Sequence, residues 1–386
     1  MKKLNVLFIS SWFPSSKFPF NGNFVIRHAE AVSKFCNVIL LNITSDPLLD
    51  KSKLGISDQI ELIEINISSK IQIPIFRKLT IWFNYYNILC ATIKKLKNDN
   101  RKPDIIHTNI TFPTSFWGLV MKIRFNIPYI ITEHWTGFLP GTRIKQSLIK
   151  QLIAKYCCAK ASCISPVSND LRNAMQSLGY KGNYNVIPNA VNEQLFSKIN
   201  KPKSIDSTTK FIHISSLLDD HKNITGILHA FKDALEKEPK IHLTIVSDNS
   251  PEDFLRFVEN EKLTSKVSFE GPYSPLEIAN ALSNSDCFLL FSNYENLPCV
   301  IIESLMAGVP VISSQVGGIS EMINSSNGYL IPKQNIEVLT NTIIEFSCSK
   351  SMFDQKKIQK ESLLKYSYEA VGQKYLNVYL KSIKND

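Results

Sequence analysis

The chain has 386 residues, of which 44% are hydrophobic and 20% are charged. This length leaves room for two or three domains with filled cores, and the ordinary composition excludes a disordered tail or a coiled coil as the main organisation. The formal charge is +10, and most of it lies in residues 1–200, which hold 25 basic and 11 acidic side chains. Two domains with different partners, one of them anionic, would explain this asymmetry, and so would a solvated lysine-rich surface.

Short apolar runs and scattered cysteines narrow the class of protein. Leu4–Ile9 is too short for the apolar part of a signal peptide, and no small-residue cleavage site follows it. Leu79–Ile93 and Ile105–Met121 fall short of the ~20 residues that cross a bilayer. The eight cysteines form no CxxC pair and no zinc-like spacing. We therefore expect a cytoplasmic protein with free thiols. Because no GxGxxG or P-loop motif occurs, a dinucleotide-type dehydrogenase and a P-loop ATPase are excluded.

Short apolar runs alternate with amphipathic stretches along the whole chain, which predicts parallel sheets covered by helices on both faces. The first series of candidate strands is Leu4–Ser10, Val38–Ile43, Ile60–Ile65, Ile105–Thr108, Tyr129–Thr132, Ser162–Pro166 and Tyr184–Ile187. The second series is Phe211–Ser215, Ile241–Val246, Val267–Phe269, Cys287–Phe291, Val309–Ser313 and Gly328–Ile331. Two such series indicate two doubly wound α/β domains.

A polar segment separates the two series. Lys198–Lys210 lacks either period and contains proline and serine, so we interpret it as a linker. The predicted domains are residues 1–200 and residues 201–365, followed by 366–386, where an amphipathic helix over Tyr366–Ile383 could pack across either domain. Ligands of such sheets bind at the carboxyl ends of the strands, so the loops there are the places to look for chemistry.

The segment 294–318 is the richest in chemistry. Glu295 follows a predicted strand, and Pro298 suits the first turn of a helix that should stop at Gly308. Glu303 lies eight positions after Glu295, so both carboxylates can face one side of this helix. Carboxylates accept hydrogen bonds from sugar hydroxyls, and the free amides of Asn296–Val300 suit an anion or a hydroxyl. A surface carboxylate and a capping carboxylate would give the same pattern.

In order and spacing, several motifs resemble those of retaining glycosyltransferase family 4. The E-x7-E block is followed by AGVPVI at 307–312 and by Gly317-Gly318. Other motifs extend the resemblance over most of the chain: PDIIH at 103–107, PYIITEHWTG at 128–137, SPVSNDL and VIPNAVNEQLF within 165–196, and VSFEGPY at 267–273. The resemblance implies an α/β GT-B fold, with two Rossmann-like doubly wound domains facing a central cleft. The N-terminal domain would bind the acceptor and the C-terminal domain the nucleotide-sugar.

The resemblance also assigns roles to residues. Glu295 matches a glutamate that contacts the donor sugar, Glu303 one that binds ribose hydroxyls, and His134 a histidine near the donor sugar and phosphates. Gly22 matches a glycine that lets backbone approach the diphosphate. As bare residues, His134 could be a satisfied core histidine and Gly22 a simple turn glycine. The further donor-binding residues that we expect are Ser216, Gly271, Tyr273, Asn296, Leu297, Pro298, Cys299 and Val300.

One segment departs from the family pattern. Ser215-Ser216 stands where a Gly-Arg pair is usual, whereas the lysine that follows is kept as Lys222, one position late. A serine hydroxyl does not replace a bidentate guanidinium on a diphosphate. Either Lys222 carries the charge alone, or an arginine such as Arg27 or Arg143 reaches in, or activity is reduced or the donor is different.

The reaction implied by the resemblance is transfer of a sugar from a nucleotide-diphosphate-sugar to a hydroxyl of a glycan or lipid-linked acceptor, with retention, in bacterial surface polysaccharide synthesis. Glu295, His134 and Lys222 would form the catalytic group, and the departing phosphate would take the acceptor proton. Orientation and stabilisation of negative charge would be the protein's contribution. No Asp-x-Asp motif follows a predicted strand, so we expect no cofactor and no metal requirement.

Alternative functions and partners remain at this stage. Two basic amphipathic segments, Arg77–Lys102 and Arg143–Lys160, could lie on an anionic membrane or could be packed helices with solvated lysines. A nucleotide-sugar epimerase of the same fold is one alternative enzyme, and a non-catalytic sugar-binding relative is another reading. Only the charge suggests nucleic acid, and because no reading element is visible we expect no such partner.

Overall fold

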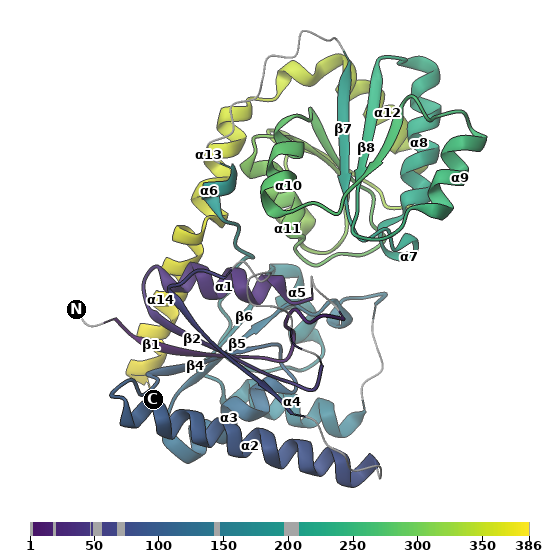
Figure 1. Cartoon of the computed structure of the whole chain (residues 1–386). Helices are drawn as coiled ribbons and strands as arrows, with labels where there is room; N and C mark the ends of the chain where they lie inside the picture. Colours follow the sequence, from purple (N-terminus) through teal and green to yellow (C-terminus); the bar gives the residue numbers. More distant parts are fainter. Residues whose placement is uncertain are drawn as a thin grey trace. The chain divides into compact units, whose positions relative to one another are not determined.

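The computed structural model describes residues 3–17, 21–46, 48, 56–67, 74–142, 147–196 and 208–385 (Figure 1). The chain divides into two compact units: unit 1 is Met1–Ala190 with Tyr368–Asp386, and unit 2 is Val191–Ser367. Each unit is built on a six-stranded sheet flanked by helices. The predicted fold class of two Rossmann-like doubly wound domains is confirmed.

The sheet of unit 1 is parallel throughout, in the order β3-β2-β1-β4-β5-β6. Its strands are β1 (Asn5–Ser10), β2 (Asn37–Thr44), β3 (Ile60–Asn66), β4 (Ile105–Asn109), β5 (Tyr129–Glu133) and β6 (Cys163–Pro166). Its helices are α1 (Asn23–Ser33), α2 (Pro74–Asn98), α3 (Thr114–Phe125), a 3-10 turn (Thr136–Phe138), α4 (Leu148–Lys160), α5 (Asn169–Ser177) and α14 (Tyr368–Asn385).

Both faces of this sheet are covered, which explains why its central strands are apolar without alternation. Every residue of β1, β4 and β5 is buried. Helices α1 and α14 pack together on one face, where Val371, Tyr375 and Tyr379 join the core of α1 and β1. Helices α2, α3 and α4 cover the other face (Figure 1). The end of the chain therefore completes the core of the first unit.

The sheet of unit 2 is also parallel, in the order β12-β11-β10-β7-β8-β9. Its strands are β7 (Thr209–Ile214), β8 (Ile241–Val246), β9 (Val267–Glu270), β10 (Cys287–Leu290), β11 (Val311–Ser314) and β12 (Gly328–Ile331). Its helices are α6 (Glu193–Phe196), α7 (Asp219–Lys222), α8 (Ile224–Lys237), α9 (Glu252–Asn260), α10 (Pro275–Ser283), α11 (Cys299–Met306), α12 (Ile336–Ser349) and α13 (Gln355–Tyr366), with 3-10 turns at Gly317–Glu321 and Lys350–Met352.

One of the expected strands is wrong. Tyr184–Ile187 is not a strand: Asn185 and Ile187 donate to the carbonyl oxygens of Ile164 and Pro166, but the only bridge pairs Tyr184 with Ile164. Asparagines and the following Pro188 are poor strand formers, so the segment runs beside β6 without extending the sheet.

The expected C-terminal helix over Tyr366–Ile383 is confirmed as α14, which begins two residues later than expected, at Tyr368. Helix α13 ends at Tyr366, Ser367 is extended (φ −61°, ψ 156°), and α14 begins at Tyr368. An extended residue ends the helical hydrogen-bond ladder, and this break falls where unit 2 passes into unit 1.

Most of the expected linker, residues 198–207, lies outside the described residues, and its last two residues belong to β7. In the part of the chain that the structure describes, no helix is long and apolar enough to cross a membrane. All eight cysteines are free thiols. Five of them are buried, Cys90 and Cys299 are half-buried, and Cys348 is exposed.

Candidate active site

The site in unit 2 is built from two loops at the carboxyl edge of its sheet. Strands β7 and β10 are paired neighbours, so the loops that follow them lie side by side. The loop after β7 leads into α7 and ends on Lys222, and the loop after β10 carries Ser292 and Glu295 before α11 begins at Cys299. Residues that are 73 positions apart in sequence are thereby brought into contact.

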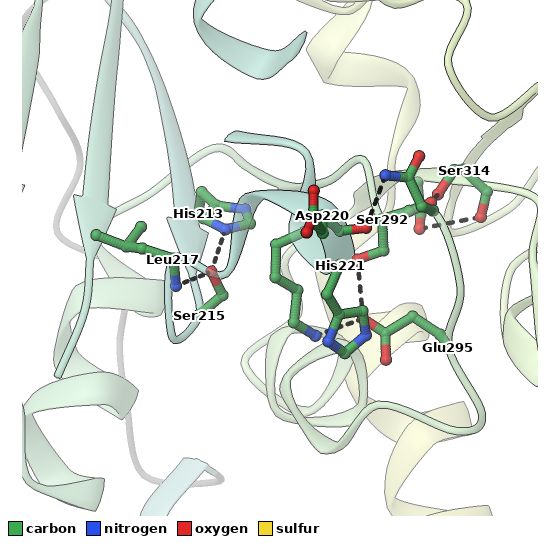
Figure 2. A network of polar contacts seen from close by, with 11 residues as sticks. His213, Ser215, Leu217, Asp220, His221, Ser292, Glu295 and Ser314 are labelled. Carbon is green, nitrogen blue, oxygen red and sulfur yellow. Dashed lines mark hydrogen bonds and ion pairs between the residues drawn. The ribbon is translucent and has the colours of Figure 1, made fainter. Parts of the chain in front are cut away.

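Glu295 is the centre of this site. Its Oε1 atom lies 2.5 Å from Lys222 Nζ, accepts a hydrogen bond from Ser292 Oγ at 2.8 Å, and is 3.5 Å from His221 Nε2 (Figure 2). Only 6% of Glu295 is exposed. The Oε2 atom makes no such contact with the described residues. One carboxylate oxygen thus makes all the contacts that hold these side chains together.

The charge on Glu295 is fixed by this arrangement. Burial pushes the pKa of its carboxyl upward, but the Lys222 ammonium and the His221 side chain outweigh burial and lower it from 4.5 to about 2. Glu295 is therefore ionised at neutral pH. An ionised carboxylate accepts hydrogen bonds and cannot donate a proton.

Further contacts fix the position of Lys222. Asn293 donates from its backbone nitrogen to His221 O at 2.8 Å and from Nδ2 to Asp220 O at 3.0 Å. The His221 ring stacks on Tyr294 with 4.2 Å between ring centroids. The loop after β10 therefore packs against α7, and these contacts hold Lys222 beside Glu295.

The start of α11 lies directly beyond Glu295. Pro298 is its N-cap, so the helix begins at Cys299, one residue later than expected, and Gly308 follows its end with φ 74°. Gly318 donates to Asn296 O at 2.9 Å, and a Cβ atom on Gly317 (φ 54°) would collide with Glu295 O. The chain after AGVPVI thus packs against the Glu295 loop, and only glycine fits at position 317.

The other predicted donor-binding residues near Glu295 lie in the loop before α11 and in α11 itself. Asn296, Leu297 and Glu303 are buried, whereas Pro298, Cys299 and Val300 are half-buried. Glu303 sits in the second turn of α11, as its spacing from Glu295 required.

The departure at Ser215-Ser216 has a structural explanation. His213 donates from Nδ1 to Leu289 O at 2.8 Å, so its Nε2 accepts from Ser215 Oγ at 2.7 Å, and Ser215 Oγ in turn accepts from the Leu217 backbone nitrogen at 3.2 Å (Figure 2). Ser215 therefore shapes the loop and has no hydrogen left to donate to a phosphate. Ser216 accepts through its backbone oxygen from Asn249 Nδ2 and brings no charge.

Of the arginines considered as replacements, Arg27 lies on α1 of unit 1 and Arg143 lies outside the described residues. Lys222 is the cation that the structure places beside Glu295.

Gly271 and Tyr273 follow β9 at the same edge of the sheet. Gly271 has φ 104°, and a Cβ atom there would lie 2.5 Å from Ser247 O, so the loops after β8 and β9 touch only because this residue is glycine. The Tyr273 hydroxyl donates to Glu270, which raises the pKa of Tyr273 to about 12. Ser216 joins these loops through Asn249.

Unit 1 brings two further predicted residues together. His134 follows β5 directly, is 7% exposed, and stacks on Phe24 with 3.9 Å between ring centroids. Phe24 belongs to the first turn of α1, whose N-cap is Gly22 at φ 73°. A Cβ atom on Gly22 would collide with Trp12 O. Glycine is thus required there, and His134 and Gly22 lie at one edge of the sheet.

Sequence reasoning missed Glu133, which organises this edge. Its carboxylate accepts from the backbone nitrogens of Thr111 at 2.7 Å and of His134 and Trp135 at 2.8 Å each, and from the Thr111 hydroxyl. Burial raises its pKa, although these hydrogen bonds favour the ionised form. A carboxylate directly after the apolar strand YIIT was the available signal, because a buried acid needs several donors.

A cavity of about 230 Å³ opens beside Glu133 in unit 1. Trp12, Phe112, Trp135, Phe138 and Tyr180 form most of its wall. Ile110, also in the wall, has φ 67°, which a β-branched residue rarely adopts and which is typical of functional sites. Aromatic walls around a hydrogen-bonded carboxylate suit the face of a sugar ring or another apolar group with hydroxyls.

Comparisons with known proteins agree with this architecture. Residues 52–195 match the family model described as Glycosyltransferase Family 4, and residues 196–362 match the model described as Glycosyl transferases group 1. The alpha-monoglucosyldiacylglycerol synthase of Streptococcus pneumoniae is 26% identical over 227 residues, covering 54% of this chain and 51% of that protein. The chain therefore spans about half the length of that relative.

Solved structures share the fold over the full chain. The sucrose-phosphate synthase of Thermosynechococcus elongatus has a TM-score of 0.77 at 18% identity and covers 100% of both chains. The Anabaena protein HepE, in a complex with UDP-glucose, has a TM-score of 0.67 at 17% identity and covers 97% of this chain and 98% of its own. These likenesses, with the two six-stranded sheets, define a glycosyltransferase architecture of the GT-B type. The chain belongs to glycosyltransferase family 4.

Proposed function

We propose that this protein transfers a sugar from a nucleotide-diphosphate-sugar to a hydroxyl of a glycan or lipid-linked acceptor, with retention at the anomeric carbon, in bacterial surface polysaccharide or glycolipid synthesis. The observation that carries the proposal is the buried Glu295 carboxylate, with Oε1 held by Lys222, Ser292 and His221 and Oε2 left without a partner among the described residues. A hydroxyl-rich ligand supplies the donors that this oxygen lacks.

The charges of the site suit a diphosphate leaving group. Lys222 uses one of its three N–H bonds on Glu295 and keeps the others for phosphate oxygens. The start of α11 adds backbone amides that favour an anion. Because Glu295 is ionised, it serves to orient the sugar, and the departing phosphate accepts the acceptor proton. One well-placed donor to the developing charge contributes about 3–4 kcal/mol.

The donor class is supported by one structural relative. HepE is described in a complex with UDP-glucose. We propose that Glu303 binds the ribose, that Gly271 and Tyr273 lie toward the base, that His134 and Gly22 lie toward the sugar and phosphates, and that no metal is needed. The aromatic cavity of unit 1 is the proposed acceptor pocket.

Glu295→Gln tests this function, with Glu252→Gln on the exposed start of α9 as the matched control. UDP-, GDP- and dTDP-sugars are screened for hydrolysis and transfer, and the anomeric configuration of the product is read by NMR. We expect Glu295→Gln to lower kcat about 100-fold or more, while the control behaves like the wild type. An inverted product, or full turnover by Glu295→Gln, would refute the mechanism; no reaction with any nucleotide-sugar would favour the non-catalytic alternative.

The acceptor is proposed to be reached at a membrane surface. Phe76, Leu79 and Phe83 on α2 are 55%, 62% and 64% exposed, and Leu148, Ile149 and Leu152 on α4 are 76%, 71% and 67% exposed. Both groups lie in the N-terminal halves of helices that follow β3 and β5, hence toward the carboxyl edge that bears His134. The exposed Arg77, Lys78 and Lys150 lie among them. Apolar side chains with basic neighbours suit an anionic bilayer.

Leu152→Glu tests membrane contact, with Leu364→Glu on α13 as its control because Leu364 is 71% exposed. Vesicles of phosphatidylcholine with phosphatidylglycerol are the probe. Since burying a leucine contributes about 1.5–3 kcal/mol, Leu152→Glu should weaken binding about tenfold or more, and Leu364→Glu should not. Equal binding by both variants, or binding that added salt does not reduce, would contradict the membrane role.

A further inference from the structure

A chain of buried hydrogen bonds connects α14 with the surroundings of His134. Tyr379 Oη lies 2.7 Å from His107 Nδ1, and His107 Nε2 lies 2.6 Å from Thr132 Oγ1. Thr132 Oγ1 lies 3.0 Å from Tyr375 Oη, and Tyr375 Oη lies 3.5 Å from His28 Nδ1. The last link joins His28 Nε2 to Pro188 O at 3.2 Å. These atoms come from α14, β4, β5, α1 and the segment beside β6.

The direction of every bond follows from one end. Pro188 O can only accept, so His28 Nε2 carries a proton, and in a neutral ring Nδ1 must then accept from Tyr375. Having donated there, Tyr375 accepts from Thr132, and Thr132 accepts from His107 Nε2.

His107 Nδ1 then accepts from Tyr379. With these donors and acceptors, each of the five hydrogen bonds is satisfied when both His28 and His107 are neutral. Burial lowers the pKa of His28 to about 4 and that of His107 well below 6.5, in agreement with neutral rings.

The chain ends beside a proposed active-site residue. The ring centroids of His28 and His134 are 5.2 Å apart, and Asn189, which follows Pro188, interacts with the His134 ring through its side chain. His28 therefore holds the backbone of the residue before Asn189 and packs near His134 itself. Arg27, His28 and His107 are the titratable or charged groups that lower the pKa values of the histidines in this cluster.

We propose that Tyr375 and His28 are positioning residues for sugar transfer: their hydrogen bonds hold Pro188 and Asn189, and through them the ring of His134. This inference rests on the proposed function, because it takes His134 to act on the donor. It gives the C-terminal helix a part in the reaction besides its part in the core. His28 and Tyr375 are fully buried, so they act through His134 and not on the substrate itself.

Tyr375→Phe tests the inference because it removes one hydroxyl and keeps the ring in the core. Tyr129→Phe is the matched control: Tyr129 is also fully buried in unit 1, and its hydroxyl donates to Cys157 O at 2.6 Å, apart from the histidines. The full chain labelled with 15N-histidine shows tautomers and pKa values without any substrate. Kinetics use the donor found in the screen above.

In the wild type and Tyr129→Phe, we expect His28 and His107 to be neutral with the proton on Nε2. In Tyr375→Phe, His28 Nδ1 loses its hydrogen-bond donor, so the 15N shift of this nitrogen should move toward that of a nitrogen without a hydrogen bond, while burial still lowers the pKa of His28. Transfer by Tyr375→Phe should fall at least fivefold in kcat with a nearly unchanged KM, whereas Tyr129→Phe follows the wild type.

Three results would overturn the inference. The first is a wild-type His28 with its proton on Nδ1, and the second is an unchanged 15N shift of His28 Nδ1 in Tyr375→Phe. The third is the same loss of transfer in both variants at every pH, which would show a structural effect only. A wild type that turns over no nucleotide-sugar would instead refute the proposed function, and with it the kinetic part of the inference, while the NMR spectra would still show the bond directions.

Discussion

Replacing Lys222 by methionine removes the ammonium beside Glu295 and keeps a side chain of similar length. Lys222 and Glu295 side chains are 13% and 7% exposed, so solvent screens the pair little. Two unit charges 2.5 Å apart attract by about 7 kcal/mol at an effective dielectric constant of about 20. Burial of the carboxylate opposes this attraction, and the pKa of about 2 against 4.5 corresponds to a net gain of about 3 kcal/mol for the ionised form.

The sign of the pH dependence follows from the lowered pKa. A carboxyl whose pKa is lower in the folded state stabilises the fold above its ordinary pKa, and the contribution disappears as the pH falls from 4.5 toward 2. Lys222→Met should therefore cost about 3 kcal/mol at pH 7, which lowers the melting temperature of unit 2 by about 6–12 °C. The difference from the wild type should shrink below pH 4.

Thermal unfolding followed by circular dichroism at pH 7 and pH 3.5 measures this effect. The double variant Lys222→Met/Glu295→Gln is the control, because it replaces the buried ion pair by two neutral groups and should recover most of the lost melting temperature. A pH-independent loss, or a double variant as unstable as Lys222→Met, would refute the reasoning that the ion pair holds this site. Transfer should fall at least 100-fold in both variants, since both lack the cation for the leaving group.

Three further outcomes are expected. Gly317→Ala should displace the Glu295 loop and abolish transfer. The control Gly141→Ala also has a positive φ (85°) but nothing within 4 Å of its Cβ, so it should lower the free energy of unfolding in urea titrations by only about 1 kcal/mol. Equal effects of the two variants would contradict the steric argument. Ser216→Arg should lower the KM for the donor about fivefold by adding a bidentate phosphate ligand, and a raised KM would place this residue away from the diphosphate. Transfer assayed with EDTA should equal transfer with added Mg²⁺, and a loss with EDTA would contradict a metal-free mechanism.

Much of the fold followed from local patterns. The continuous apolar run at residues 287–291 predicted β10 to within one residue, because a strand covered on both faces is apolar throughout. The strands at residues 241–246 and 328–331 were predicted with their observed bounds. Helix α11 was predicted to within a residue at each end, since Pro298 and Gly308 mark its ends through their own backbone preferences. The segment 184–187 misled because its apolar residues pack beside β6 without a ladder of paired residues.

The sequence singled out candidate site residues but not their contacts. Glu295 and His134 stood out by their position after strands and Lys222 by the family resemblance, yet the pairing of Glu295 with Lys222 depends on β7 and β10 being neighbours, which no local pattern encodes. Glu133 was overlooked because a single acid beside a histidine carries no periodic signal, and its four donors come from a distant loop as well as its own.

The excess of positive charge in residues 1–200 did not identify Lys222, the cation beside Glu295, which lies in the other half of the chain. By itself, the sequence determined the strands, the order of the motifs and the family, because these depend on side-chain periodicity and on the backbone preferences of glycine and proline. Only the tertiary structure decided that Ser215 is committed to His213, that Lys222 is held by Glu295, and that α14 completes unit 1 through Tyr375 and Tyr379. The physical reason is that hydrogen bonds and ion pairs between buried groups join residues far apart in the chain, and their partners exist only once the sheets have formed.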